Sequence, residues 1–394
     1  MSRLLVLGAG PYQLPVIERA MELGCHVIAA DYIATNPGHR VAHASAVAST
    51  VDLEAMLAVA RKHEIDGVLT YGSDVSAPAV SYIAERLGLP GNSFETAALL
   101  QRKDRIRALQ RELGLPHPRF VAGSSVEELL DPPLPALFKP ADSSGSKGQT
   151  VVRNRDEVAA AFETARVFSR CGVVVAEELL PDDTTELVFE AYIEDGRLVF
   201  GHYGHNWFCD DVHPRVPSGE MVPGDFDDAM IAEIDRQIQT LVTGAGVRTG
   251  CMNFDALLSR GEVVIVDIGL RSGGNFVPEV VRLSTGVDLT TAAIHAALGK
   301  RFEVPSLHVA NARCILAQIL HSHVAGRFEA LEVSIDLIAE HLFVSPGDEV
   351  KPFTRGDAAV GVAIFEQPSV GAAYELIKRM PHPCRVLVQP SSRA

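Results

Sequence analysis

The chain has 394 residues, of which 47% are hydrophobic and 22% are charged, and its formal net charge at pH 7 is −15. This length predicts roughly two to four domains, because a single hydrophobic core rarely serves a chain of more than about 300 residues. The composition is typical of a globular enzyme, and the negative charge argues against nucleic acid or an anionic membrane surface as the main partner.

The six cysteines lie far apart, and no two of them form a C-x-x-C pair. This spacing favours neither a zinc site nor a disulfide framework, so reduced thiols in the cytoplasm are the simplest interpretation. The sequence shows no signal-peptide cleavage pattern and no apolar run long enough to span a bilayer. We therefore expect a cytoplasmic protein without a membrane partner, and a homodimer is the prior expectation for its oligomeric state.

The first 93 residues alternate apolar strands with amphipathic helices, which predicts a parallel sheet with helices on both faces. The turn Gly8-x-Gly10 precedes the first helix, as in a dinucleotide-binding unit, but Gln13 occupies the position of the third glycine. The predicted elements are strands at residues 3–7, 27–30 and 67–70 and helices at residues 14–23, 53–62 and 77–87.

Two lysines stand out in the next stretch of the chain. A charged helical pattern at residues 94–113 carries Lys103, and an apolar strand at residues 134–139 ends on Lys139. A lysine that closes a buried strand is costly unless it meets an anion. On local context alone, Lys103 is better explained as a solvated helix residue.

The segment D-S-S-G-S-K-G, residues 142–148, follows Lys139 and precedes a strand at residues 149–152. Strand, flexible turn and strand predict a hairpin tip that is able to fold over a ligand. Backbone N–H groups freed by glycine, serine hydroxyls and a lysine suit phosphate oxygens, although the spacing is not that of a Walker A loop. Taken alone, a surface turn explains the segment equally well. The candidate phosphate-binding residues are Ser143, Ser144, Gly145, Ser146, Lys147 and Gly148.

After a helical pattern at residues 156–170, a strand at residues 173–176 leads into E-E-L-L. Edge backbone groups there could pair with an adenine, with a leucine against the ring, and a later acid could hold the ribose hydroxyls. Exposed acids at a strand end are the alternative. The candidate nucleotide-binding residues are Glu177, Glu178, Leu180 and Glu186.

Antiparallel strands are predicted at residues 186–193 and 197–203, and an irregular stretch at residues 205–225 follows them. Irregular segments of this length within a compact domain are often functional. A helix at residues 227–245 and a second helical region that ends near Lys300 enclose a hairpin rich in acids.

In this hairpin, Asp255 and Asp267 flank the turn Arg260-Gly261 and the β-branched run V-V-I-V. The turn predicts that the two strands pair and bring the carboxylates together, with Arg271 just beyond the strand end. Two acids are the usual protein share of a Mg²⁺ site whose other ligands are phosphate oxygens and water. A surface hairpin with charged ends would explain either acid alone and explains the whole set less well.

The order of these pieces resembles the ATP-grasp superfamily over roughly residues 1–300. L-Q-R-K-D-R-I-R is similar to that family's helix with a nucleotide-binding lysine, L-F-K-P-A-D-S-S-G-S-K-G to its lysine and phosphate loop, and V-D-I-G-L-R-S-G-G-N to its metal-binding strand. The resemblance implies a mixed α/β and α+β fold. Its parts would be an N-terminal parallel α/β domain at residues 1–93, an ATP-grasp domain at residues 94–304 with a mobile lid at about 134–195, and a small C-terminal α+β cap at residues 305–394.

By the same resemblance, the reaction is the ADP-forming ligation of a small-molecule carboxylate, such as an amino acid, to an amine through an acyl phosphate, with ATP and Mg²⁺ as cofactors. Asp255 and Asp267 would bind the metal, and Lys103, Lys139 and the loop at residues 143–148 would surround the phosphates. Arg271 would hold the carboxylate, so Arg271 and Lys139 are the candidate catalytic residues.

Two positions depart from the family pattern. The second metal ligand is most often glutamate and is Asp267 here, and the asparagine expected two residues later is Gly269. A water molecule, Asn253 or Asn275 could complete the coordination instead.

The acceptor pocket is predicted in the irregular stretch, and a packed loop with an aromatic plug is the alternative. Two other functions stay open for the chain as a whole. A nicotinamide-dependent oxidoreductase would use the N-terminal glycine turn with Asp31 on the ribose, and a non-catalytic ATP-binding module would explain Gly269. The candidate acceptor residues are His202, Tyr203, His205, Trp207 and Arg215.

Overall fold

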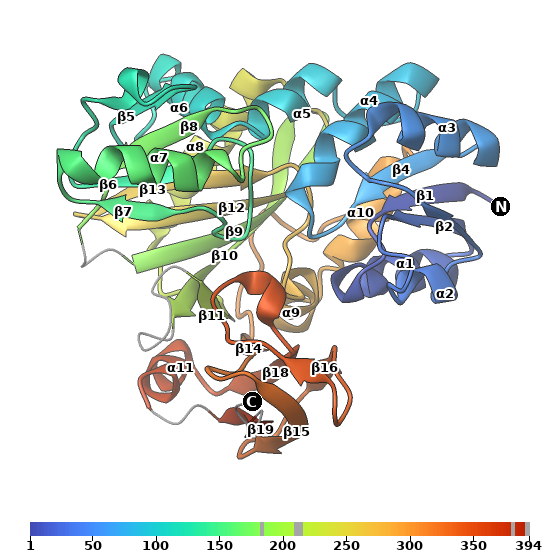
Figure 1. The fold of residues 1–394 in the computed structure, drawn as a ribbon. Coiled ribbons are helices and arrows are strands. Elements are labelled where there is room, and N and C mark those ends of the chain that lie inside the picture. The colour runs from blue at the N-terminus through green and yellow to red at the C-terminus, as the bar shows by residue number, and fades with distance from the viewer. Residues whose placement is uncertain (182–184, 209–215, 380–382, 391–394) are drawn as a thin grey trace.

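The computed structural model describes residues 1–181, 185–208, 216–379 and 383–390. Its strands form four sheets, and Figure 1 shows the N-terminal part in blue beside the large sheet, with the C-terminal strands in orange and red below them. No helix in the described ranges combines the length and the apolar character needed to cross a membrane.

The N-terminal sheet is parallel, with the strand order β3-β2-β1-β4. Leu4 and Val6 pack under α1, and Leu5 and Leu7 pack under α3 and α4, so both faces of β1 are buried. This arrangement confirms the predicted parallel sheet. The elements are β1 Arg3–Leu7, α1 Leu14–Glu22, β2 His26–Asp31, α2 Gly38–Val41, β3 Ala44–Val47, α3 Leu53–His63, β4 Gly67–Thr70 and α4 Ala77–Leu87.

The helical region predicted at residues 94–113 is two helices, α5 (Phe94–Leu100) and α6 (Lys103–Glu112). Arg102 has an extended backbone between them, and the backbone N–H of Lys103 donates to the carbonyl oxygen of Ala141 at 2.8 Å. Lys103 is therefore the first residue of a helix and is tied to the end of a strand. Its side chain is only 8% exposed, so it is not a solvated helix residue.

A second, antiparallel sheet has the order β5-β8-β6-β7 and is covered on one face by α7. The loop at residues 142–148 joins β6 to β7, as predicted, and positive φ at Gly145, Ser146 and Gly148 curls it back. The elements are β5 Phe120–Gly123, β6 Ala136–Pro140, β7 Thr150–Val152, α7 Val158–Arg166 and β8 Val174–Glu178.

The large sheet has eight strands in the order β13-β12-β9-β10-β11-β14-β18-β16. Phe254 and Ile268 belong to the hydrophobic core cluster that also contains residues of α8. Because side chains alternate along a strand, their neighbours Asp255 and Asp267 lie on the opposite face. The elements are β9 Thr185–Glu194, β10 Arg197–Phe208, β11 Pro217–Val222, α8 Asp228–Ala245, β12 Gly250–Ser259, β13 Glu262–Gly269, α9 Val277–Thr285 and α10 Leu289–Ala297.

The prediction of an irregular stretch at residues 205–225 is wrong for most of its described part. Residues 205–208 continue β10, and β11 pairs with it in antiparallel register. Gly219 weakens the strand pattern of β11 in the sequence. A glycine is needed at this position because a Cβ there would lie 2.0 Å from the ring of Trp207.

The C-terminal residues supply strands to the large sheet and form one small sheet, β17-β15-β19, of their own. The large sheet therefore runs on past residue 304, where a domain boundary was predicted. The elements are β14 Cys314–Leu320, β15 Gly326–Val333, β16 Ala339–Leu342, β17 Glu349–Val350, β18 Gly361–Gln367, α11 Val370–Ile377 and β19 Cys384–Pro390.

Candidate active site

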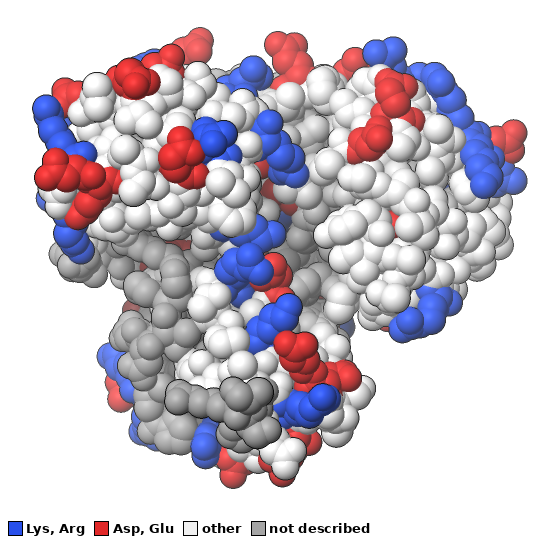
Figure 2. Space-filling view, in the orientation of Figure 1, with Lys and Arg blue, Asp and Glu red and all other residues white. Residues whose placement is uncertain are grey.

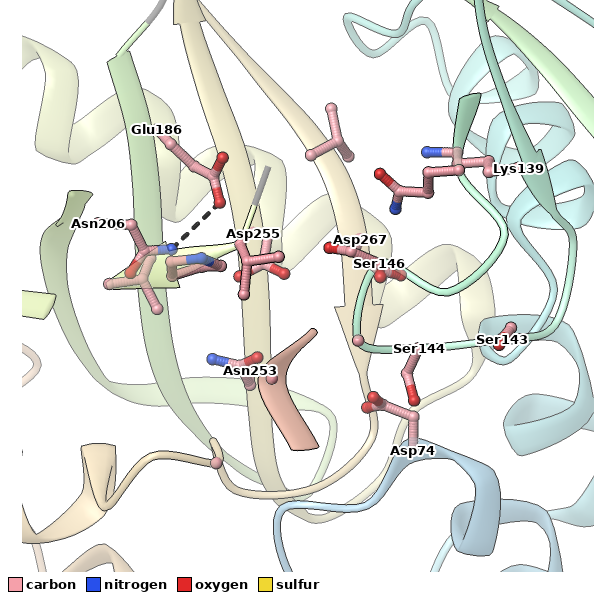
Figure 3. A pocket seen from close by; sticks show the side chains of 18 of the residues that line it. Asp74, Lys139, Ser143, Ser144, Ser146, Glu186, Asn206, Asn253, Asp255 and Asp267 are labelled. Carbon is pink, nitrogen blue, oxygen red and sulfur yellow. Dashed lines mark hydrogen bonds between the residues drawn. The ribbon is translucent and has the colours of Figure 1, made fainter. Parts of the chain in front are cut away.

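The acid hairpin borders a cavity of about 440 Å³. Asp255 and Asp267 are directly paired across β12 and β13, so their side chains share one face of the sheet. Arg260 and Gly261 form the turn, with φ of 52° and 79°. This confirms the predicted hairpin, and Figure 3 shows both carboxylates facing the serine loop across the cavity.

The cavity brings together most of the candidate residues from distant parts of the sequence. Gly148 is the exception, because it lies against Phe168, where a Cβ would approach the ring to 2.7 Å. The candidates that line the cavity are Lys103, Lys139, Ser143, Ser144, Gly145, Ser146, Lys147, Glu177, Glu178, Leu180, Glu186, Asp255, Asp267 and Arg271.

Lys103 links the loop to the acid pair. Its Nζ lies 3.0 Å from Asp267 Oδ2 and donates to the carbonyl oxygen of Ser143 at 3.1 Å. Burial alone would lower the pKa of Lys103, but the charge and hydrogen bond of Asp267 raise it above its ordinary value. The lysine therefore stays charged at one end of the cavity.

Lys139 belongs to a buried cluster of charges. Its Nζ lies 2.7 Å from Glu177 Oε2, and Arg107 Nε lies 3.0 Å from Glu177 Oε1. Burial lowers the pKa of Lys139. Burial alone would raise the pKa of Glu177, but the charges of Arg107 and Lys139 outweigh it and lower that pKa below its ordinary value. The side chain of Glu177 thus positions Lys139 at the cavity wall.

At the end of β8, two backbone N–H groups already donate to other parts of the protein. The backbone N–H of Glu178 donates to the carbonyl oxygen of Arg119, and that of Leu179 donates to the carbonyl oxygen of Pro135, both at 2.8 Å. The carboxylate of Glu178 also accepts a hydrogen bond from Arg119 Nε at 2.7 Å. Leu180 follows these bonded residues and lines the cavity.

The acid pair fits a divalent cation. Burial and the charge of Asp267 raise the pKa of Asp255 to about 7. Although burial opposes it, the charge of Lys103 holds the pKa of Asp267 below its usual value. Within the described ranges, no group of three or more His, Cys, Asp or Glu side chains could hold a metal. A cation on this pair would offset their repulsion and take its remaining ligands from phosphate oxygens and water.

Arg271 is fixed by contacts from two parts of the chain. Its Nε donates to Asp74 Oδ1 at 2.6 Å, and its Nη1 donates to Asn253 Oδ1 at 3.1 Å. The charge of Asp74 outweighs burial and raises the pKa of the arginine. Because two edges of the guanidinium are bonded, its plane is set before any ligand arrives.

The ion pair of Arg271 with Asp74 explains why a glycine occupies position 269. A Cβ at Gly269 would lie 2.6 Å from Asp74 Oδ1 and 2.9 Å from Arg271 Cζ, so the ion pair fills the space above the glycine. Asn253 bonds Arg271 and Glu190, and Asn275 bonds Glu220. Both asparagines are thus engaged away from the acid pair.

The described residues of the predicted acceptor pocket do not line this cavity, and Arg215 lies outside the described ranges. His202, for example, is buried, and its Nε2 lies within hydrogen-bonding distance of Ser284 Oγ, at 3.1 Å. Burial lowers the pKa of His202 to about 4. The side chain of β10 that does reach the cavity is Asn206. The candidates that do not line the cavity are His202, Tyr203, His205 and Trp207.

In the N-terminal glycine turn, two backbone N–H groups already donate hydrogen bonds to side chains of the protein. Gln13 Oε1 accepts from the backbone N–H of Gly10 at 3.0 Å, and Asp31 Oδ2 accepts from that of Ala9 at 2.9 Å. A pyrophosphate at this turn would need the same N–H groups. The turn therefore offers little support for the oxidoreductase alternative.

Sequence reasoning missed several polar residues of the cavity. Asp74 begins the short helical turn that follows the end of β4, and the carboxyl end of a parallel strand is a frequent place for ligand-binding residues, so this signal was available. Glu220 lies on β11, a strand that the sequence pattern does not predict. The missed polar residues that line the cavity are Tyr12, Asp74, Gln149, Asn206, Glu220 and Asp357.

Comparison with known proteins agrees with this geometry, although no family model matches the sequence. The formate-dependent phosphoribosylglycinamide formyltransferase of Synechococcus sp. (strain RCC307) is 30% identical over 392 residues, covering 94% of each chain. The solved L-amino acid ligase from Bacillus licheniformis has a TM-score of 0.82 at 18% identity and 99% coverage of each chain. The N5-carboxyaminoimidazole synthetase from Staphylococcus aureus, complexed with ADP, has a TM-score of 0.74 at 15% identity and 95% coverage of each chain.

The fold and these comparisons confirm the ATP-grasp resemblance drawn from the sequence. The chain is an ATP-grasp enzyme that acts on small molecules by ATP-dependent, ADP-forming, ligase-type chemistry, with Mg²⁺ as the metal. It belongs to the family of the formate-dependent phosphoribosylglycinamide formyltransferases.

Proposed function

We propose that the chain is an ADP-forming carboxylate–amine ligase that activates a small carboxylate on Arg271. A carboxylate oxygen attacks the γ-phosphorus of ATP, an O–P bond forms, and the bond to ADP breaks. The amine nitrogen then attacks the acyl carbon, a C–N bond forms, phosphate leaves, and the amine loses a proton. The observation that supports this proposal is the placement of the acid pair, two buried lysines and a fixed arginine around one cavity.

The lysines and the loop would position the phosphates. Lys103 is charged and anchored to Asp267, and Lys139 is held at the wall by Glu177. Mg²⁺ bound by Asp255 and Asp267 would neutralise phosphate charge. Phosphoryl transfer depends mainly on such positioning and charge neutralisation, so an additional acid or base is not required for the first step.

Arg271 would hold the substrate carboxylate. Nε and Nη1 already donate to protein oxygens, and none of the described residues accepts from Nη2. That nitrogen is available to an anion and to the oxyanion that develops as the acyl phosphate reacts.

The test is ADP release with Mg·ATP over a panel of carboxylates and amines, with the product identified by mass. Arg271→Ala should lower the turnover by roughly 100-fold or more, because it removes an electrostatic contact to the reacting group. Arg313→Ala is the matched control, since Arg313 pairs with Glu366 on the surface. Full activity of the Arg271 variant, or stabilisation by ATP without ADP release from any substrate pair, would overturn the proposal.

The sequence relatives favour a second candidate, the transfer of a formyl group from formate to phosphoribosylglycinamide. The same two steps apply, with formate as the carboxylate. Including formate and phosphoribosylglycinamide in the panel separates this reaction from ligation of another carboxylate.

A further inference from the structure

One wall of the cavity carries polar atoms that the fold leaves without partners. Among the described residues, Glu220 Oε2, Asn206 Oδ1 and the Tyr12 hydroxyl are buried and have no hydrogen-bond partner. All three residues line the cavity. Glu220 is 5% exposed and Asn206 is 9% exposed. An unsatisfied buried polar atom costs stability, so three around one cavity indicate a missing ligand group.

Two of the three groups face each other across a strand pair and are held by hydrogen bonds. Asn206 and Glu220 are directly opposed across β10 and β11, which puts both side chains on one face. Asn206 Nδ2 donates to Glu186 Oε1 at 3.2 Å, and Asn275 Nδ2 donates to Glu220 Oε1 at 3.3 Å. Figure 3 shows the bond between Asn206 and Glu186 beside the acid pair. The first bond engages Nδ2 of Asn206 and leaves its Oδ1 without a partner, and the second engages Oε1 of Glu220 and leaves its Oε2 without one.

Tyr12 completes the wall from the N-terminal part of the chain. It lines the same cavity as Glu220 and packs against the core cluster that includes Val222, two residues further along β11. Burial raises the pKa of its hydroxyl, and the charge of Glu220 raises it further. A carboxylate oxygen, an amide oxygen and a hydroxyl oxygen are three acceptors. A primary ammonium group has three N–H donors and no acceptor, so it matches the set.

The charges of the cavity favour a cation at this wall over a phosphate group. Lys103 and Lys139 are each paired with an acid, and Lys147 lies in the serine loop. Burial raises the pKa of Glu220 well above its ordinary value, and the charge of Arg271 opposes this rise. Arg271 lines the same cavity and precedes Asn275, which bonds Glu220, by four positions in the chain.

We propose that Tyr12, Asn206 and Glu220 bind the ammonium group of an α-amino acid whose carboxylate binds Arg271. The inference rests on the proposed ligase function and names its substrate class. An ammonium on one side and a carboxylate on the other match the acidic wall and the arginine in a cavity of about 440 Å³.

The experiment compares amino acids with the same acids lacking the amino group, for example alanine with propionate and glycine with acetate. ADP release with Mg·ATP gives kcat/KM for each. We expect the wild type to prefer the amino acid by roughly 10- to 100-fold, the usual effect of hydrogen bonds to a charged group. Glu220→Gln should remove most of this preference, and Glu366→Gln, on the surface of the same sheet, should retain it.

Two further measurements keep the test decisive. Tyr12→Phe removes only a hydroxyl and should lower the preference several-fold even if the Glu220 variant does not fold. The thermal shift produced by the amino acid in the presence of nucleotide should shrink in both variants. Equal use of propionate and alanine, or an unchanged preference in Tyr12→Phe and Glu220→Gln, would overturn the ammonium site alone. Turnover of formate without turnover of any amino acid would do the same. Absence of ADP release with every carboxylate would instead overturn the proposed function.

Discussion

Replacing Gly269 with alanine tests the geometry that holds Arg271. A Cβ at this position would lie 2.6 Å from Asp74 Oδ1 and 2.9 Å from both Cζ and Nε of Arg271. Folded proteins do not tolerate such distances, so the Nε–Oδ1 bond of 2.6 Å must lengthen or break. The substitution therefore acts on Arg271 without changing any polar group.

The magnitude follows from the exposure of the pair. The side chain of Arg271 is 12% exposed and that of Asp74 is 27% exposed. Breaking a fully buried pair costs about 3–5 kcal/mol, and an exposed pair is worth at most about 1 kcal/mol. We expect Gly269→Ala to lower the free energy of unfolding by about 2 kcal/mol, and Gly269→Asn to lower it by more because its side chain is longer.

Urea unfolding gives the change in stability, and ADP release gives the change in turnover. Gly274→Ala is the matched control, because a Cβ there would meet nothing within 4 Å. Wild-type stability and turnover in Gly269→Ala would refute the reasoning. A gain of Mg²⁺-dependent activity in Gly269→Asn would show instead that the glycine is simply a lost metal ligand.

Three other substitutions probe separate parts of the site. Glu177→Gln should destabilise the protein by about 3–5 kcal/mol in urea unfolding, because it leaves Arg107 and Lys139 buried without a full counter-charge. Asp255→Asn should abolish most of the stabilisation by Mg·ATP, which is about 2.7 kcal/mol for a wild type at a hundredfold excess over Kd. Glu190→Gln should change the dependence of stability on pH. Burial raises the pKa of Glu190 from 4.5 to about 8, so the folded wild type retains a proton that the unfolded chain loses. Its stability should therefore fall as pH rises from about 4.5 to about 8, by a few kcal/mol in order of magnitude, and the glutamine variant should lack this part of the loss.

Each of these has a result that contradicts it. An unchanged urea midpoint in Glu177→Gln would mean that the cluster around Lys139 is solvated. An equal Mg·ATP shift with and without Asp255 would remove that residue from the metal site. Parallel stability curves for wild type and Glu190→Gln between pH 5 and pH 8 would mean that Glu190 is ionised throughout.

The acid hairpin and the serine loop could be predicted from the order of residues within short stretches of the sequence. The run V-V-I-V and the turn at Arg260 and Gly261 set strand, turn and pairing within twenty residues, so Asp255 and Asp267 could be placed together from the sequence. The same locality explains the failure after residue 205. Gly219 weakened the strand signal of β11, and only the ring of Trp207 explains why a glycine is needed there.

The sequence by itself determined the parallel N-terminal sheet, the lysine near the end of β6, the serine loop and the facing acids, because each depends on residues close together in the chain. Only the tertiary structure decided how these parts meet. Arg271 bonds Asp74 across 197 positions, and Lys103 bonds Asp267 across 164. Such contacts depend on how whole sheets pack, and no local periodicity encodes them. For that reason the fixed arginine, the role of Gly269 and the acidic wall at Glu220 emerged from the folded chain.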